Sequence, residues 1–348
     1  MIEDYKIERI SQIIIHVLYS RFENFPIDAE GNRNAPFHTA FLKAFADKLQ
    51  NKINDINYFI TMSSWLHGLS TTLGQTFFEK TAHILSDGEK REYTSKKLGL
   101  LKITEHQSAE ITNIISDLYN DVCVPNVANE EQRINALNYG NEVYATGFSA
   151  DVYYETDNEI IAIELKSVKP NSGEMRGEKK KILEGRTALQ RLNPYKQVKF
   201  YIGFPFDPTG NGTEYNKERF SNTVINLRKS FALNEMLIAE ELWDKLSGSS
   251  GTMQTLLDLI NTIATTDFID NFNYINDINN RLKPKYLDIL RKWNLHDEIF
   301  IISNIDSIIQ KSKTNKSLQK LINSTLFDTS GKYKTERAHD IISLLKKD

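Results

Sequence analysis

The fold expected for this chain depends most on the stretch from Ser149 to Lys166, which is S-A-D-V-Y-Y-E-T-D-N-E-I-I-A-I-E-L-K. Two runs rich in β-branched and aromatic residues, 151–155 and 159–166, flank the pair Asp157-Asn158. Short polar side chains at such a pair tolerate the left-handed backbone of a tight turn. The stretch therefore predicts an antiparallel β-hairpin.

A two-residue turn also fixes the register of the hairpin, and it places Asp151 directly opposite Glu164. The Cβ atoms of such a pair lie roughly 5 Å apart, and two like charges there are destabilising unless a cation lies between them. The period of two puts Lys166 on the same face as Glu164. The opposite face carries the residues expected in the core, which are Ile161, Ile163 and Leu165. We infer a site for a divalent cation.

Two carboxylates beside a lysine suit phosphodiester hydrolysis. Magnesium takes oxygen ligands and commonly binds through one or two carboxylates together with phosphate oxygens of the substrate. It would lower the pKa of a bound water and stabilise the charge that develops on the phosphate, while Lys166 could orient the attacking water or neutralise that charge. The alternative is a hairpin face that is only a charged surface, and the spacing alone leaves it open.

The pattern of Asp151 followed by Glu164-Leu165-Lys166 resembles the D…(E)xK signature of the PD-(D/E)xK nuclease superfamily. Ala150 stands where many members have proline. Further stretches are similar to the TdeIII-type restriction endonucleases, and these are Trp65 to Leu69, Leu73 to Glu79 and Ser167 to Lys179. The resemblance covers about residues 65–251.

This resemblance implies a magnesium-dependent, sequence-specific double-strand DNA endonuclease of a bacterial restriction-modification system. It implies a short palindromic target of the GGNCC kind, and a palindrome is matched most simply by a two-fold homodimer. A cognate DNA methyltransferase would protect the host DNA. The implied metal ligands are Asp151, Glu164 and the Leu165 carbonyl. Glu79 would complete the metal shell, with Glu110 as the competing candidate.

The expected fold class is α/β, with a restriction-endonuclease-like core in which helices flank a central mixed sheet. The predicted order of helix, three strands, helix and strand corresponds to a helix at 104–122, a strand at 142–146, the hairpin, a helix at 177–192 and a strand at 197–204. The predicted parts are an N-terminal helical region at 1–64, the nuclease core at 65–206 and a mostly helical C-terminal region at 207–348 that packs with the core as one unit. Fold order alone does not establish activity.

The charge distribution adds a DNA-binding prediction. Overall, 43 Lys and Arg residues stand against 46 Asp and Glu residues, which gives a net charge of -3. Residues 166–199, however, contain ten basic and three acidic residues. A basic strip of this kind supplies phosphate contacts for a polyanion. The residues predicted to contact DNA are Lys169, Asn171, Arg176 and Lys180, whereas Arg186, Arg191 and Lys196 fit a solvated helix face.

The composition excludes several other classes of protein. The 348 residues are 40% hydrophobic and 26% charged, without an apolar run of about 20 residues or a signal-peptide pattern, so we expect a cytoplasmic protein. Cys123 is the single cysteine, which excludes an internal disulfide. The phosphate-loop motif and the strand-linked G-x-G-x-x-G motif are missing, and the seven histidines are scattered.

Two other functions stay open at this point. The same core could belong to a repair or recombination nuclease that cuts DNA structures rather than sequences. A non-catalytic DNA-binding or scaffold protein would carry the same carboxylates as surface charges. Digestion of a defined duplex separates these readings, because only a sequence-specific enzyme produces discrete fragments from it.

Overall fold

The computed structural model describes residues 1–27, 55–166, 174–224 and 226–346, with the single residues 38, 40 and 42. The chain divides into two compact units. The sheet unit comprises residues 1–2 and 79–258, and the helical unit comprises residues 3–78 and 259–348. The helical unit thus combines a segment that precedes residue 79 in the sequence with a segment that follows residue 258. The predicted boundaries of the nuclease core, after residue 64 and after residue 206, stay a prediction.

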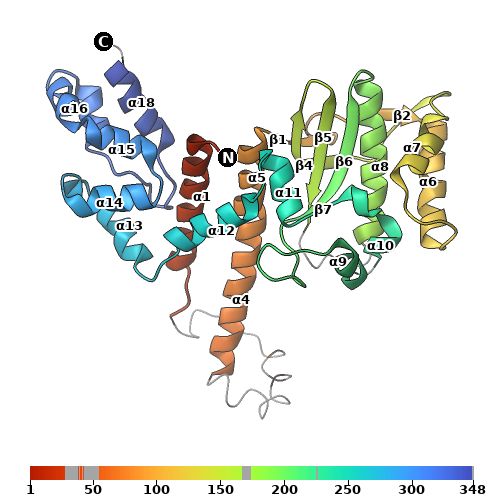
Figure 1. Cartoon of the computed structure of the whole chain (residues 1–348), viewed down its shortest axis with the longest axis horizontal. Coiled ribbons are helices and arrows are strands. Elements are labelled where there is room, and N and C mark those ends of the chain that lie inside the picture. Colours follow the sequence, from red (N-terminus) through yellow and green to blue (C-terminus); the bar gives the residue numbers. More distant parts are fainter. Residues whose placement is uncertain are drawn as a thin grey trace. The chain divides into compact units, whose positions relative to one another are not determined.

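A five-stranded mixed sheet forms the centre of the sheet unit (Figure 1). Its strands, in spatial order, are β1 (Glu89–Tyr93), β4 (Phe148–Glu155), β5 (Glu159–Leu165), β6 (Gln197–Phe204) and β7 (Met236–Ile238). Strand β4 pairs antiparallel with both β1 and β5, whereas β5, β6 and β7 run parallel. Residues 160–163 of the middle strand are almost completely buried, as expected for a strand that is covered on both faces.

The predicted hairpin is formed by β4 and β5. Its register runs from Val152 opposite Ile163 to Glu155 opposite Ile160. The Thr156 amide donates a hydrogen bond of 2.9 Å to the carbonyl of Glu159, which closes the turn at residues 157 and 158. Both the hairpin and its register are confirmed.

Helices cover both faces of the sheet (Figure 1). The helices on one face are α5 (Glu79–Ser86) and α11 (Glu240–Ser247), and α8 (Glu174–Leu192) lies on the other, with α6 (Glu105–Tyr119) packed against α8. The parallel pair of β5 and β6 needs a crossover connection, and α8 supplies it. The predicted helices at 104–122 and 177–192 and the strand at 197–204 are therefore confirmed. Helix α11 ends at Gly248, whose φ of 68° is the left-handed conformation that a glycine cap adopts readily.

One predicted strand belongs to a different sheet. The segment expected at 142–146 forms β3 (Glu142–Tyr144), but it pairs with β2 (Lys102–Thr104) in a separate two-stranded sheet. Strand β1, and not the predicted strand at 142–146, pairs with β4 in the five-stranded sheet. The sequence of β1 is E-K-R-E-Y, in which four of five residues are charged, so it lacks the alternation that marks a strand. The three-residue β7 is too short to carry a pattern.

The sheet unit also contains shorter elements, and these are α7 (Val127–Asn135), α9 (Lys217–Thr223), α10 (Leu227–Ser230), the 3-10 turn η3 (Leu233–Glu235) and the first turns of α12 (Thr252–Ile263). The helical unit contains α1 (Asp4–Glu23), α4 (Ile56–Thr72), the π-helical segment η2 (Leu73–Phe78), α13 (Phe268–Asn276), the 3-10 turn η4 (Ile278–Asn280), α14 (Pro284–Lys292), α15 (His296–Ser303), α16 (Ile305–Ser312), α17 (Lys316–Ile322) and α18 (Thr335–Lys346).

Helix α1 packs against the helices that follow residue 259. Tyr19 stacks on Phe272 with ring centroids 4.3 Å apart, and Phe22 stacks on Phe268 at 5.5 Å. Helix α1 lies in the predicted N-terminal helical region at 1–64, part of which lies outside the described residues. No helix among the described residues is long and apolar enough to cross a membrane.

Candidate active site

The hairpin register brings Asp151 opposite Glu164 when it is continued by one pair beyond Val152 and Ile163. The backbone amide of Leu165 donates a hydrogen bond of 3.0 Å to Asp151 Oδ2, so the Asp151 side chain reaches across to β5. On the other side, His83 Nε2 of α5 lies 2.6 Å from the Asp151 carbonyl oxygen. A carbonyl only accepts, so the imidazole donates this bond. Asp151 is thus held from two directions.

Glu164 is a partly buried carboxylate, with a side chain that is 12% exposed, and its pKa is raised. The pKa of Glu164 is raised to about 7, mainly by burial and also by the negative charge of Asp151, while the Lys166 ammonium opposes the rise. Lys166 Nζ lies 3.0 Å from Glu164 Oε1. Two carboxylates are therefore close enough to repel one another, which is the situation that a bound cation relieves.

Lys166 is held by a second carboxylate that the sequence did not single out. Its Nζ lies 3.2 Å from Oε1 of Glu178, which belongs to α8 and is 4% exposed. Burial lowers the pKa of Lys166, but the charges of Glu164 and Glu178 outweigh burial and raise it above its usual value. The Lys166 amide donates to the Gly203 carbonyl at 2.9 Å, so the backbone there continues the parallel ladder. The ammonium group is therefore charged and held in place.

Strand β1 contributes Lys90 to the same group of charges. Lys90 Nζ lies 2.9 Å from Asp151 Oδ1 and 3.4 Å from Oε1 of Glu79, the first residue of α5. The competing candidate Glu110 instead pairs with Arg133 of α7 at 2.6 Å. Of the two candidates for the third carboxylate, the structure brings Glu79 beside Asp151. The sequence does not indicate Lys90 as a site residue, because the strand that carries it lacks the alternation of a β-strand.

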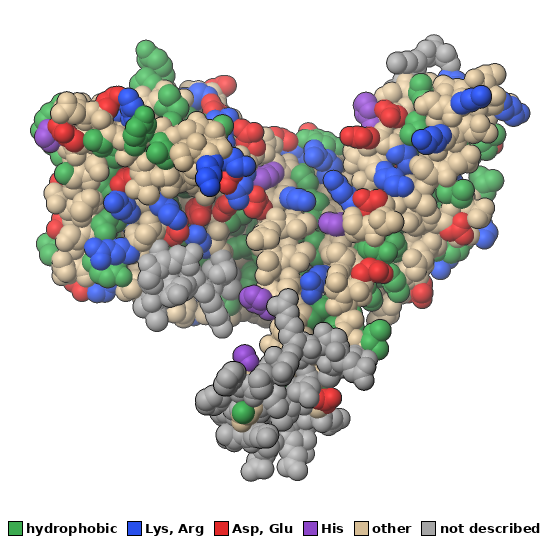
Figure 2. Space-filling view, turned by 180° about the vertical axis from the view of Figure 1, so that it is seen from behind, with side chains coloured by type: hydrophobic (Ala, Val, Ile, Leu, Met, Phe, Trp, Pro, Cys, Tyr) green, Lys and Arg blue, Asp and Glu red, His purple; other side chains and the backbone are tan. Residues whose placement is uncertain are grey.

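The basic strip at 166–199 is neutralised to a large extent by the fold. Six of its ten cations form ion pairs with carboxylates from outside the strip, and these are Lys166, Lys179, Arg186, Arg191, Lys196 and Lys199. Lys179 is completely buried between Glu130 and Glu235, with 2.7 Å to each. Over the unit that contains the sheet, Figure 2 shows lysine and arginine side chains next to aspartate and glutamate side chains rather than a single basic surface.

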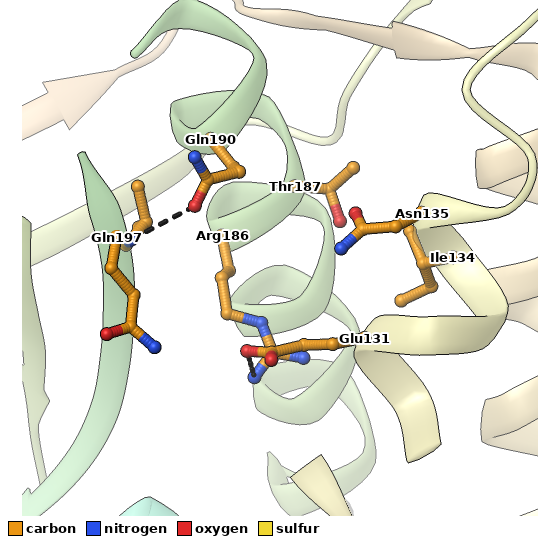
Figure 3. Close-up of a pocket in the computed structure, with 8 residues that line it drawn as sticks. Glu131, Ile134, Asn135, Arg186, Thr187, Gln190 and Gln197 are labelled. Carbon is orange, nitrogen blue, oxygen red and sulfur yellow. Dashed lines mark hydrogen bonds and ion pairs between the residues drawn. The ribbon is translucent and has the colours of Figure 1, made fainter. Parts of the chain in front are cut away.

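Arg186 illustrates this pairing in detail. Its Nη1 lies 3.3 Å from Glu131 Oε1, and its side chain turns toward α7 beside a cavity of about 90 Å³ (Figure 3). Gln190 closes one side of that cavity, where its side-chain oxygen accepts a hydrogen bond from the Val198 amide at 3.1 Å. Arg186 is 5% exposed, so it is a structural residue and not part of a solvated helix face.

The residues predicted to contact DNA fall into two groups. Lys169 and Asn171 lie outside the described residues. Arg176 and Lys180 lie on α8: the Arg176 guanidinium stacks over the Tyr119 ring at 4.6 Å, and Lys180 Nζ is 3.7 Å from Glu184. Arg176 is exposed and Lys180 is partly exposed, and their DNA contacts stay a prediction.

The donor set fits a magnesium ion. Within the described parts of the chain, no three His, Cys, Asp or Glu side chains form a group that could hold a metal ion alone. Magnesium, however, is commonly held by one or two carboxylates, with water and substrate oxygens as the other ligands. Asp151 and Glu164 provide two such carboxylates, and the negative charge of Asp151 adds to burial in raising the pKa of Glu164.

Comparison with known proteins identifies the family. The family described as "Type II restriction endonuclease, HinfI" matches residues 3–264. The chain is also 40% identical to the type II restriction enzyme MjaII of Methanocaldococcus jannaschii, over 98% of this chain and 97% of the relative. The predicted resemblance to type II restriction endonucleases is confirmed. The protein therefore belongs to the HinfI family of type II restriction endonucleases, and it is a site-specific deoxyribonuclease.

Proposed function

We propose that the enzyme is a magnesium-dependent endonuclease with a restriction-endonuclease-like PD-(D/E)xK core, and that its active site lies at the ends of β4 and β5. Asp151, Glu164 and the Leu165 carbonyl would hold the metal ion, and Glu79 would complete its shell. Lys166 would serve the attacking water. The observation that carries this proposal is the convergence of Asp151, the partly buried Glu164 and Lys166 on one end of the hairpin.

The reaction places different demands on these side chains. When bound, magnesium would act as a Lewis acid toward the scissile phosphate. Lys166 is positioned to hold a water or a phosphate oxygen, because its charged ammonium lies between Glu164 and Glu178. The Leu165 amide and the His83 imidazole hold Asp151 in place through hydrogen bonds to its side chain and its carbonyl. Groups fixed before the substrate arrives need no reorganisation in the transition state.

The proposal extends to the substrate and the assembly. The target would be a short palindrome of the GGNCC kind, cut in both strands by a homodimer, because a two-fold protein matches a two-fold site. Lys169, Asn171, Arg176 and Lys180 would contact the DNA. A cognate methyltransferase would protect the cellular DNA, and the enzyme would act in the cytoplasm.

The experiment is digestion of unmethylated phage DNA by the native protein, Asp151→Asn and Lys166→Ala, each with and without magnesium. We expect discrete fragments from the native protein only, and only with magnesium. Asp157→Asn is the matched control, since Asp157 is an exposed residue at the turn of the same hairpin. It should cut as the native protein does.

Other outcomes would support a different function. Cleavage only of branched or flapped DNA would favour a structure-specific repair nuclease. DNA binding without cleavage in any divalent metal, by a folded protein and unchanged by Asp151→Asn, would favour a non-catalytic role. Full activity of Asp151→Asn would place the active site elsewhere in the chain.

A further inference from the structure

Lys90 occupies a position that a metal ion would compete for. Its Nζ contacts Asp151 Oδ1 at 2.9 Å, while the other oxygen of that carboxylate, Oδ2, accepts the Leu165 amide at 3.0 Å. Both Asp151 oxygens therefore have a partner in the chain itself. The same ammonium group lies 3.4 Å from each carboxylate oxygen of Glu79.

The ammonium thus links the two carboxylates that come from different elements, α5 and β4. A positive charge between two carboxylates relieves the repulsion that they would otherwise feel. A divalent ion bound to the same Asp151 oxygen would be repelled by this ammonium and would have to displace it. The Lys90 side chain is 36% exposed and lies on the edge strand of the sheet, so it can move into solvent without disturbing the core.

We propose that Lys90 is an internal counter-ion of the metal-free enzyme, and that metal binding requires its displacement from Asp151. This inference rests on the proposed function, because it takes Asp151 as a metal ligand. Lys90 then keeps the carboxylates in place before the metal arrives. It also sets the metal concentration at which the site fills, because the ion has to break the pair of Lys90 and Asp151.

The test measures metal binding itself, in the absence of DNA. Manganese binding to the native protein and to Lys90→Met is followed by titration calorimetry at neutral pH. Methionine keeps the length of the side chain and removes its charge. Loss of a partly exposed ion pair and of the repulsion by a nearby cation should tighten manganese binding about tenfold.

Lys102→Met is the matched control. Lys102 is also a strand lysine in the sheet unit, and its Nζ pairs with Glu142 Oε2 at 3.2 Å. This variant should bind manganese as the native protein does. Lys90→Arg, which retains the charge, should bind no more tightly than the native protein. Thermal unfolding supplies a second measurement: metal should raise the melting temperature of Lys90→Met by more than that of the native protein.

The outcomes separate this inference from the proposed function. If the native protein binds manganese and cuts DNA but Lys90→Met shows the same or weaker affinity, the counter-ion role is overturned and the nuclease proposal stands. If Asp151→Asn binds manganese as tightly as the native protein, the metal site lies elsewhere and both proposals are overturned. Tighter binding by Lys90→Met with native-like binding by Lys102→Met supports the proposal.

Discussion

Replacing Lys179 by methionine should destabilise the protein strongly, because two buried carboxylates would lose their shared cation. Lys179 Nζ lies 2.7 Å from both Glu130 and Glu235, and the three side chains are at most 5% exposed. Removing one partner from a buried ion pair typically costs about 3–5 kcal/mol. For a folded unit of about 150–250 residues, each kcal/mol lowers the melting temperature by about 2–4 °C. The expected decrease is therefore about 6–20 °C.

The assay is thermal unfolding followed by circular dichroism at neutral pH. Lys180→Met is the control, because Lys180 is the next residue of the same helix and its pair with Glu184 is 44% exposed at the lysine. Glu184 is buried but keeps the hydrogen bond from the Thr146 amide. An ion pair with a lysine this exposed contributes about 1 kcal/mol, so this variant should melt near the native protein. The triple variant Lys179→Met, Glu130→Gln, Glu235→Gln removes the orphaned charges and should recover much of the loss.

Two results would refute this reasoning. If Lys179→Met melts within about 2 °C of Lys180→Met, the buried triad contributes little to stability. If the triple variant is no more stable than Lys179→Met alone, then the loss comes from packing and not from uncompensated charge.

Three further predictions follow from other contacts. Glu178→Gln removes one of the two carboxylates that hold Lys166, so the single-turnover cleavage rate should fall about tenfold, or about 1.4 kcal/mol, with little change in DNA affinity; an unchanged rate would remove Glu178 from the site. Gly203→Ala should lower the unfolding free energy by about 1–3 kcal/mol, because a Cβ there would lie 2.9 Å from Ile163 Cγ2; urea denaturation would show no loss if the sheet can adjust. Burial raises the pKa of Glu8 to about 7 from its ordinary 4.5, so the native state binds more protons than the unfolded state between these values and its stability falls as pH rises through them. The native protein should therefore melt at a lower temperature at pH 8 than at pH 5, and Glu8→Gln should reduce this difference. If Glu8→Gln shows the same pH dependence of the melting temperature as the native protein, Glu8 is not its source.

The hairpin at the centre of the site could be predicted because its information is local. The pair Asp157-Asn158 fixes the turn, and the turn fixes which residues of β4 and β5 face each other. Helix α8 and strand β6 follow from their apolar periodicity in the same way. Each of these elements is defined within a window of about 20 residues.

The remainder of the site depends on contacts between distant segments. Strand β1 is recognisable only by its pairing with β4, so Lys90 could not be assigned to the site from sequence. The basic strip is misleading for the same reason, since the partners of Lys179 are Glu130 and Glu235, far away in sequence. Net charge counted along a segment ignores the carboxylates that fold against it.

The division of the chain between the two units has a consequence for synthesis on the ribosome. All residues of the sheet unit from 79 to 258 emerge before the last residues of the helical unit, which extends to 348. Compact units generally fold one by one as the chain emerges. The sheet unit can thus be complete while α1 still lacks the helices whose rings stack on Tyr19 and Phe22. Those two aromatic side chains need protection from aggregation until translation ends.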